Sequence, residues 1–382
     1  MVTSQKPSEK NVEYRGSKSD FIFNLKTKFK LKSVKEQRVD GSQCINLTHL
    51  SCTLLGFERN SRIKIPSNPI NKSRLYSTIE AQQGENQNFK MDPWFITGFA
   101  DAECCFYISI IKNCQLKRGW QTLACFEIEL DAKDKVLLDR IQAYFGVGNV
   151  YKAERNTSRY MVRTLKDLAV IIDHFEKYPL ITSKWSDFEL FKQVVDLINR
   201  KEHLTFEGLQ QIVNLRASIN NGLSPKLKEA FPDTLPVQRP IVNDQVIKNP
   251  NWLVGFTSGE GCYHVSIFKS LTKLGEAVRL NFAITQHYRD EQLMRSLMEY
   301  FDCGNLYKDR EVFHYRVGKF SDIENKIIPF FKEYPLQGVK ANDFADFCKV
   351  AELMVSESHL TKDGLEQIRQ IKAGMNRGRE LK

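Results

Sequence analysis

Two short segments of this sequence end in a glutamate, and their residue types could support metal-dependent chemistry. Residues 95–104 read FITGFADAEC and residues 252–261 read WLVGFTSGEG, so Glu103 and Glu260 stand at matching positions. A helix C-terminus repels a carboxylate, so two carboxylates brought together there need a cation between them. Carboxylate oxygens suit Mg²⁺, which stabilises the attacking and leaving oxygens when a phosphodiester bond is cleaved. Taken singly, each glutamate would be an ordinary solvated helix end, but the matched pair favours a metal site.

Small residues spaced four apart precede both glutamates. Gly98 and Ala102 in the first segment, and Gly255 and Gly259 in the second, each lie on one face of a helix. Glycine inside a helix costs about 1 kcal/mol relative to alanine, and close backbone contact is the simplest compensation. We therefore expect these four residues to form a domain interface at which the two helices pack together.

The sequence after residue 91 consists of two matching halves. Glu260 follows Glu103 by 157 positions, and two later blocks repeat with an offset of 156. These blocks are FEKYPLITSKWSDFELFKQV (175–194) with FKEYPLQGVKANDFADFCKV (331–350), and HLTFEGLQQI (203–212) with HLTKDGLEQI (359–368). The pattern predicts two copies of one domain, residues 91–223 and 250–382. The join, residues 224–249, is rich in proline, which is typical of a semi-rigid linker.

Each half has the same pattern of apolar residues. Asp92-Pro93 and Asn249-Pro250 are typical of helix starts, with the first residue as N-cap and proline in the first turn. Alternating apolar positions then predict strands, and 3.6-residue periodicity predicts helices. The expected strands cover 106–110, 122–130 and 148–164, with 263–267, 278–286 and 304–318; the expected helices cover 134–145, 166–177, 185–201 and 206–219, with 290–301, 321–333, 341–355 and 362–375. This is an α+β plan with one four-stranded antiparallel sheet in each half.

Composition favours a nucleic-acid partner. The chain has 382 residues, a net charge of +10 and a pI near 9.0, but its first 90 residues hold 16 Lys/Arg against 8 Asp/Glu. The repeated part is nearly balanced, so DNA or RNA binding requires its basic residues to gather on one face. The nine cysteines form no CxxC pair, which favours reduced thiols over disulfides or zinc. No apolar run approaches the roughly 18 residues of a membrane span.

Residues 1–90 are rich in Ser, Asn, Lys and Gln and show little periodicity, so we expect a disordered basic extension. Near its end, SRLYST resembles the cleavage site of a mitochondrial presequence. The acids of this extension fit a transit peptide poorly, and a fused upstream reading frame is the alternative.

The two glutamate segments, the duplication and the downstream blocks together resemble the LAGLIDADG homing endonucleases. The resemblance spans about 92–376 and is similar to the single-chain, two-repeat members encoded in mitochondrial introns. It implies two tandem pseudo-symmetric αββαββα domains whose sheets form a DNA-binding saddle. It also implies a mitochondrial, monomeric enzyme with an internal pseudo-dimer and no membrane partner. Such an enzyme would hydrolyse double-stranded DNA at a long asymmetric target with Mg²⁺.

The resemblance also assigns site residues. Glu103 and Glu260 would bind the metal with help from the carbonyls of Ala102 and Gly259. The lysines after the YPL blocks, Lys184 and Lys340, would line basic pockets and stabilise charge at the phosphate. Gln286 matches a glutamine at the end of the second strand that lies near the site in relatives. Leu130 holds that position in the first half, so we expect an asymmetric pocket.

Several residues depart from the family pattern. Cys104 replaces the final signature glycine of the first half, and Ser258 replaces the sixth-position aspartate of the second. We expect Ser258 to be tolerated because that position is not the metal ligand. Cys104, and the acids Glu127 and Glu129 on a strand that should approach phosphates, put full activity of the first half in question.

Strand alternation predicts which side chains face DNA. If Phe106, Ile108 and Ile110 pack under the first sheet, their neighbours face outward. The predicted DNA-binding residues are Tyr107, Ser109, Lys117 and Arg118 in the first half, and His264, Ser266, Lys269 and Arg279 in the second. An ordinary solvated sheet face is the alternative.

Two other functions remain open at this point. Relatives of this kind also act as maturases that help their own intron RNA to splice, so that RNA is a further candidate partner. A catalytically degenerate DNA-binding remnant is the other alternative, with Cys104 as its main support.

Overall fold

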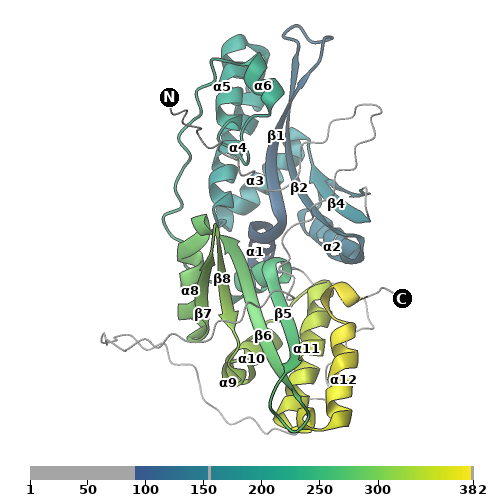
Figure 1. The fold of residues 1–382 in the computed structure, drawn as a ribbon. Coiled ribbons are helices and arrows are strands. Elements are labelled where there is room, and N and C mark those ends of the chain that lie inside the picture. The colour runs from purple at the N-terminus through teal and green to yellow at the C-terminus, as the bar shows by residue number, and fades with distance from the viewer. Residues whose placement is uncertain (1–90, 154–155, 380–382) are drawn as a thin grey trace, which may run out of the picture. The chain divides into compact units, whose positions relative to one another are not determined.

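The computed structural model describes residues 91–153 and 156–379 (Figure 1). The expected extension 1–90 and its SRLYST segment lie outside the described residues. Within the described ranges, no helix has both the length and the apolar character needed to cross a membrane.

The two halves have the same order of elements. The first comprises α1 (Pro93–Glu103), β1 (Cys104–Lys112), β2 (Trp120–Asp131), α2 (Lys135–Phe145), β3 (Asn149–Lys152), β4 (Thr157–Val162), α3 (Leu165–Lys177), α4 (Lys184–Asn199) and α5 (Phe206–Arg216). The second comprises α7 (Pro250–Glu260), β5 (Gly261–Lys269), β6 (Glu276–His287), α8 (Glu291–Phe301), β7 (Asn305–Asp309), β8 (Val312–Val317), α9 (Phe320–Asp322), α10 (Ile328–Glu333), α11 (Val339–Val355) and α12 (Lys362–Ala373). The α6 helix (Pro225–Ala230) lies between them. Two further short segments matter below: the 3₁₀ turns Ala132–Asp134 and Tyr288–Asp290, which directly precede α2 and α8.

Each half contains one antiparallel four-stranded sheet. The strand orders are β1-β2-β4-β3 and β5-β6-β8-β7, and helices pack on one face of each sheet (Figure 1). The predicted α+β fold class is therefore confirmed. The cores are also duplicated. Buried rings of the first half are Phe106, Phe126, Phe175, Phe188 and Phe191, and their counterparts are Tyr263, Phe282, Phe331, Phe344 and Phe347.

Local signals explain the helix boundaries. The Asp92 carboxylate accepts hydrogen bonds from the amides of Trp94 and Phe95, as an N-cap should. One expected helix, 321–333, is interrupted: residues Ile323–Ile327 form a π-turn between α9 and α10. Pro329 lies just beyond that turn and lacks the amide that a regular α-helix requires, which accounts for the interruption.

Candidate active site

The α1 and α7 helices pack backbone against backbone at their glycines. A Cβ added to Gly98 would overlap the carbonyl of Trp252, and one added to Gly255 would overlap the carbonyl of Phe95. The contact is reciprocal, since each glycine faces the first turns of the other helix. Glycine is needed here because no side chain leaves room for this approach. The two signature helices therefore form the junction between the two halves.

This packing brings the two glutamates together at the C-terminal ends of α1 and α7. A Cβ added to Gly259 would lie 3.2 Å from Oε1 of Glu103, so the Glu103 side chain lies against α7. Burial, and next the charge of Glu103, raise the pKa of Glu260 to about 8, against the opposing effects of Lys184, Gln286 and Lys340. Both side chains are only partly exposed. The pair is thus an anionic site whose charge the protein compensates incompletely.

Each half contributes one lysine beside this pair. The Nζ atom of Lys184 donates to the carbonyl of Ala102 at 2.8 Å and to that of Ala100 at 3.4 Å. Lys340 donates to the carbonyl of Gly261. Burial disfavours the charged form of Lys184, but the negative charge of its neighbours outweighs this cost and raises the lysine pKa. Lys184 therefore remains an ammonium cation.

The site is asymmetric at Gln286. The Gln286 side chain hydrogen-bonds to Glu260 and helps to stabilise its ionised form. The matching residue Leu130 is half-buried and packs against the hydrophobic core. The carbonyl of Ala102 is engaged by Lys184, whereas Lys340 binds the residue after Glu260 instead of the residue before it.

Asp101 has a structural role that its sequence position did not reveal. Its buried carboxylate accepts hydrogen bonds from the amides of Ile181 and Thr182, from the Thr182 hydroxyl and from Nε1 of Trp252 in the other half. Ser258, its counterpart, accepts one matching bond from the amide of Gln337 at 3.3 Å. The sixth signature position therefore fastens α1 or α7 to the loop before the lysine helix.

Cys104 fits its position without strain. It has an ordinary extended backbone, with φ −78°, and its side chain is buried in the core. At the matching Gly261, an added Cβ would collide with the Cγ2 methyl of Thr257. The first half has Ala100 in place of Thr257, so the methyl contact is absent there, although an added Cβ at Gly261 would also meet the Thr257 carbonyl, a backbone group that Ala100 shares. Burial raises the pKa of Cys104 far above its usual range, so it remains a neutral thiol.

A family model described as LAGLIDADG endonuclease matches residues 96–195 and 253–351, which include both glycine–glutamate helices. This chain belongs to the LAGLIDADG endonucleases. The predicted family is thereby confirmed.

Two kinds of relative support this placement. The probable intron-encoded endonuclease 3 of Neurospora crassa is 41% identical over 387 residues, covering 96% of this chain and 70% of the relative. The chain covers a smaller share, 64%, of the probable intron-encoded endonuclease 2 of the same organism. Among solved structures, the I-SmaMI LAGLIDADG homing endonuclease bound to cleaved DNA is 44% identical with a TM-score of 0.75, covering 78% of this chain and all of that one. The LAGLIDADG meganuclease I-CpaMI bound to uncleaved DNA is 43% identical with a TM-score of 0.74, covering 75% and 99% of the two chains.

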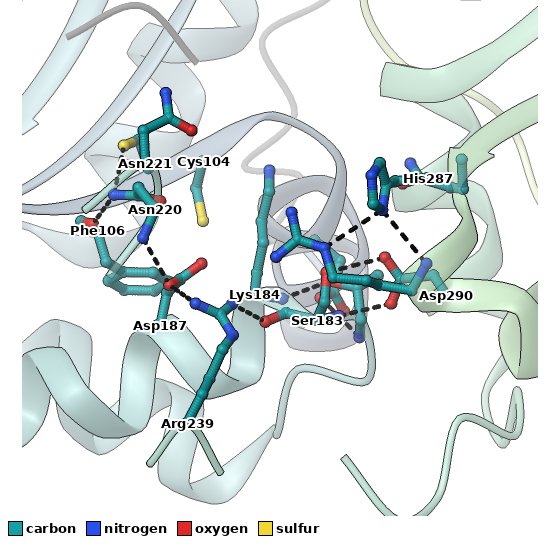
Figure 2. Close-up of a pocket in the computed structure, with 15 residues that line it drawn as sticks. Cys104, Phe106, Ser183, Lys184, Asp187, Asn220, Asn221, Arg239, His287 and Asp290 are labelled. Carbon is teal, nitrogen blue, oxygen red and sulfur yellow. Dashed lines mark hydrogen bonds and ion pairs between the residues drawn. The ribbon is translucent and has the colours of Figure 1, made fainter. Parts of the chain in front are cut away.

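A cavity of about 140 Å³ adjoins the lysine of the first half in this LAGLIDADG endonuclease. Figure 2 shows Lys184 and Cys104 on one side of it and His287 and Asp290 of the second half on the other. Arg289 also lines the cavity and donates from Nε to Nδ1 of His287 at 3.2 Å. Sequence reasoning missed His287, the last residue of β6, and Arg289, two residues further on, because neither belongs to a motif.

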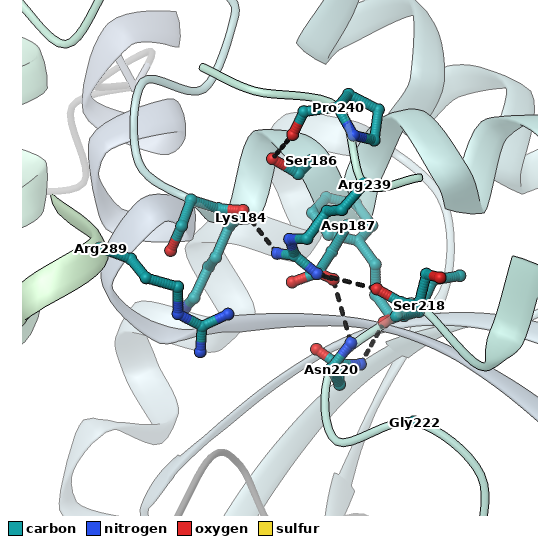
Figure 3. Close-up of polar contacts among 12 residues, drawn as sticks. Lys184, Ser186, Asp187, Ser218, Asn220, Gly222, Arg239, Pro240 and Arg289 are labelled. Atoms are coloured by element: carbon teal, nitrogen blue, oxygen red, sulfur yellow. Dashed lines mark hydrogen bonds and ion pairs between the residues drawn. The ribbon is translucent and has the colours of Figure 1, made fainter. Parts of the chain in front are cut away.

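The join between the two LAGLIDADG repeats is tightly fastened. Its central residue is Arg239, which pairs with Asp187 and donates to the carbonyls of Ser183 at 2.8 Å and Ser218 at 3.0 Å (Figure 3). The Ser186 hydroxyl then binds the carbonyl of Pro240 at 2.7 Å. Residues 231–249, called the strap below, therefore lie along the first repeat, where the proline content predicted only a semi-rigid linker. The proposed domain limits themselves stay a prediction.

The predicted DNA-facing residues occupy the expected sides of β1 and β5. On β1, Phe106, Ile108 and Ile110 are buried, whereas every second residue from Tyr107 onward is at least partly exposed. On β5, every second residue from His264 onward is likewise at least partly exposed. Partly exposed are Tyr107, Ser109, His264 and Ser266, and exposed are Lys117, Arg118, Lys269 and Arg279. Arg118 is a partial exception, because its Nε donates to the Leu204 carbonyl in the helical layer. Arg279 lies over the ring of Phe268 at 5.0 Å.

Arg159 partly compensates the charge of the two acids on β2. Arg159 stands directly opposite Glu129 on β4, and its Nη2 atom lies 2.6 Å from the Glu129 carboxylate. The same guanidinium lies 3.7 Å from buried Glu127. Thr157 donates a further hydrogen bond to Glu129 at 2.7 Å. These pairs reduce the repulsion of phosphates that the sequence suggested for the first half.

Proposed function

We propose that this chain is a site-specific homing endonuclease that hydrolyses both strands of a long, asymmetric double-stranded DNA target. The observation that carries the proposal is the meeting of Glu103 and Glu260 where α1 and α7 pack, with a lysine from each repeat beside them. A solvated helix end needs no such pairing, and a DNA-binding protein without activity gains nothing from two repelling carboxylates.

The same residues fit a divalent metal ion, for which we propose Mg²⁺. Among the described residues no cluster of three His, Cys, Asp or Glu side chains surrounds the pair. The proposed ligands are therefore Glu103 and Glu260, with the carbonyls of Ala102 and Gly259, water and phosphate oxygens completing the set. The bound ion would stabilise charge on the attacking and leaving oxygens.

The chain's own groups supply the remaining chemistry. Lys184, whose pKa is raised, and Lys340, whose Nζ atom is held by the Gly261 carbonyl, would stabilise charge that develops on the phosphate oxygens. Two pseudo-equivalent sets of glutamate and lysine match the two phosphodiester bonds of a double-strand cut. Each lysine is therefore assigned to one DNA strand.

The proposed partner is double-stranded DNA, because I-SmaMI and I-CpaMI were both seen on DNA. The protein would bind it as a single chain. The outward faces of β1 and β5 and the basic hairpins supply the binding surface. We place the protein in the mitochondrion, since relatives are named for introns of ND4 and cox1, which are mitochondrial genes. Binding to its own intron RNA stays a prediction that a splicing assay would test.

The degenerate-remnant alternative loses its main support. Cys104 is buried with an ordinary extended backbone, and both of the proposed metal-binding glutamates are present. A cleavage selection tests the proposal directly: purified protein is incubated with a randomised or mitochondrial DNA library and Mg²⁺, and the new ends are sequenced. A single long site, missing when Glu103 and Glu260 are both changed to Gln, supports the endonuclease. Enriched binding without cut ends would contradict it.

A further inference from the structure

Two aspartates stand at helix starts but do not cap their own helices. Asp134 and Asp290 occupy the N-cap positions of α2 and α8, and neither side chain makes the usual bond to the first turn. Aspartate is among the strongest N-cap residues, so both helices forgo an available stabilisation. The two residues are 156 positions apart, the same offset that separates Lys184 from Lys340.

Both carboxylates turn to the other repeat instead. Asp290 accepts hydrogen bonds from the amide of Ser183 at 2.6 Å and from its hydroxyl at 3.0 Å (Figure 2). Asp134 accepts a bond from the amide of Val339 at 2.7 Å. These contacts join residues 107 and 205 positions apart, and they are exchanged reciprocally between the two repeats.

The two amides that are bound lie directly before the two lysines of the site. Ser183 precedes Lys184 at the start of α4, and Val339 precedes Lys340 at the start of α11. A lysine side chain is long and flexible, so the position of its ammonium depends on how firmly its backbone is held. A carboxylate that accepts a hydrogen bond from the amide directly before the lysine therefore fixes the backbone from which the lysine side chain extends.

Further contacts support both aspartates. Gln245 of the strap donates to Asp290 at 2.7 Å and to the carbonyl of Ile181 at 3.1 Å, and Asp290 is buried. On the other side, a Cβ added to Gly338 would lie 2.6 Å from Oδ1 of Asp134. Gly338 also has a positive φ of 69°. The glycine therefore permits the close approach of Asp134.

We infer that Asp134 and Asp290 are positioning residues that act across the domain interface, each placing the lysine of the other repeat. This inference rests on the proposed function, in which each lysine serves one DNA strand. Each lysine would then depend on both repeats, because Asp290 of the second repeat positions Lys184 of the first, and Asp134 of the first positions Lys340 of the second.

Strand-resolved cleavage tests the inference. The target found by selection is labelled differently on its two strands, and single-turnover rates are measured with saturating enzyme and Mg²⁺. Lys184→Ala and Lys340→Ala first show which strand depends on which lysine. Asp290→Ala should then slow the Lys184-dependent strand by about tenfold or more, because small misplacements of catalytic groups have large effects on rate. Asp134→Ala should slow the other strand, and each variant should accumulate nicked DNA.

Matched controls separate positioning from general damage. Asp139→Asn on α2 and Glu291→Gln on α8 change acids that form only exposed ion pairs within their own helix, and both should leave the two rates unchanged. Asp290→Asn should recover part of the rate, because its amide oxygen can still accept the Ser183 bond. Asp290→Ala should add no further slowing to that strand in a Lys184→Ala background. Thermal unfolding identifies any variant that has lost its fold. If Asp290→Ala is unfolded, the strand-resolved rates of Asp290→Asn are compared with those of the unmodified enzyme instead.

Three results would overturn the inference. The first is equal slowing of both strands by Asp290→Ala, and the second is slowing of the Lys340-dependent strand instead. The third is an unchanged rate on both strands. If the lysine variants themselves show no strand preference, the proposed role of the lysines fails as well. If the unmodified enzyme does not cut, the endonuclease assignment fails before the aspartates are considered.

Discussion

The Nζ atom of Lys184 lies 2.8 Å from the carbonyl oxygen of Ala102, the residue directly before Glu103. The ammonium of the lysine helix is thereby tied to the end of the helix that carries the carboxylate. Because this one contact positions both the Lys184 ammonium and the Glu103 carboxylate, a substitution that disturbs the packing of α1 against α7 should displace both groups. The predictions below follow from this coupling.

Replacing Glu260 with Gln should abolish double-strand cleavage and leave DNA affinity nearly unchanged. The amide keeps the size of the side chain but removes the charge that we assign to metal binding. Supercoiled plasmid carrying the target measures cleavage, and binding is measured separately by fluorescence anisotropy in EDTA. Loss of binding together with cleavage would show instead that Glu260 is structural.

The metal requirement should depend on pH. Because the pKa of Glu260 is raised to about 8, below that pH the site holds a proton that Mg²⁺ must displace. The Mg²⁺ concentration for half-maximal cleavage should therefore fall as pH rises from about 6 to 8, by up to roughly tenfold per unit, and then level off. Calorimetry of Mg²⁺ binding in two buffers of different ionisation enthalpy should show proton release below pH 8. A metal requirement that is independent of pH would contradict this.

Replacing Gly98 with Ala should destabilise the protein strongly, by roughly 3 kcal/mol or more. The added methyl would overlap the backbone of Trp252, which cannot move without separating the two helices. Gly374→Ala is the matched control, because an added Cβ there meets nothing closer than 3.6 Å. Chemical denaturation measures the difference, and similar stabilities of the two variants would mean that the helices do not pack as described.

The fit of Cys104 predicts a specific double-mutant result. Ala100→Thr alone should destabilise the protein, because the new methyl meets the Cys104 side chain as Thr257 would meet a Cβ at Gly261. Adding Cys104→Gly should relieve much of that loss, since the pair then matches the second repeat. Cys104→Gly alone should not raise the cleavage rate. A rate increase in that single variant would revive the view that Cys104 impairs the first half.

Residues that act through neighbours in the sequence were predictable. Strand geometry explains the alternation of Phe106, Ile108 and Ile110, and helix capping explains the Asp92-Pro93 start. Helix packing explains the glycines Gly98 and Gly255. Each has a period or a local hydrogen bond that a single stretch of chain displays. The family resemblance added Lys184 and Lys340, which it assigned by matching motifs, whereas the matched positions of Glu103 and Glu260 had already indicated a metal site.

Contacts between side chains far apart in the chain could not be predicted from local patterns. Local rules assign Asp134 and Asp290 as caps of their own helices, yet both bind the other repeat. Arg239 in a proline-rich join gives no local sign of its pairing with Asp187. The two repeats, most of their strands and helices, and the matched glutamates were predictable because they depend on short-range periodicity and repetition. The pairing of each lysine with an aspartate of the other repeat depends on how the two repeats meet, which the α1–α7 packing and the contacts of Asp134 and Asp290 set together.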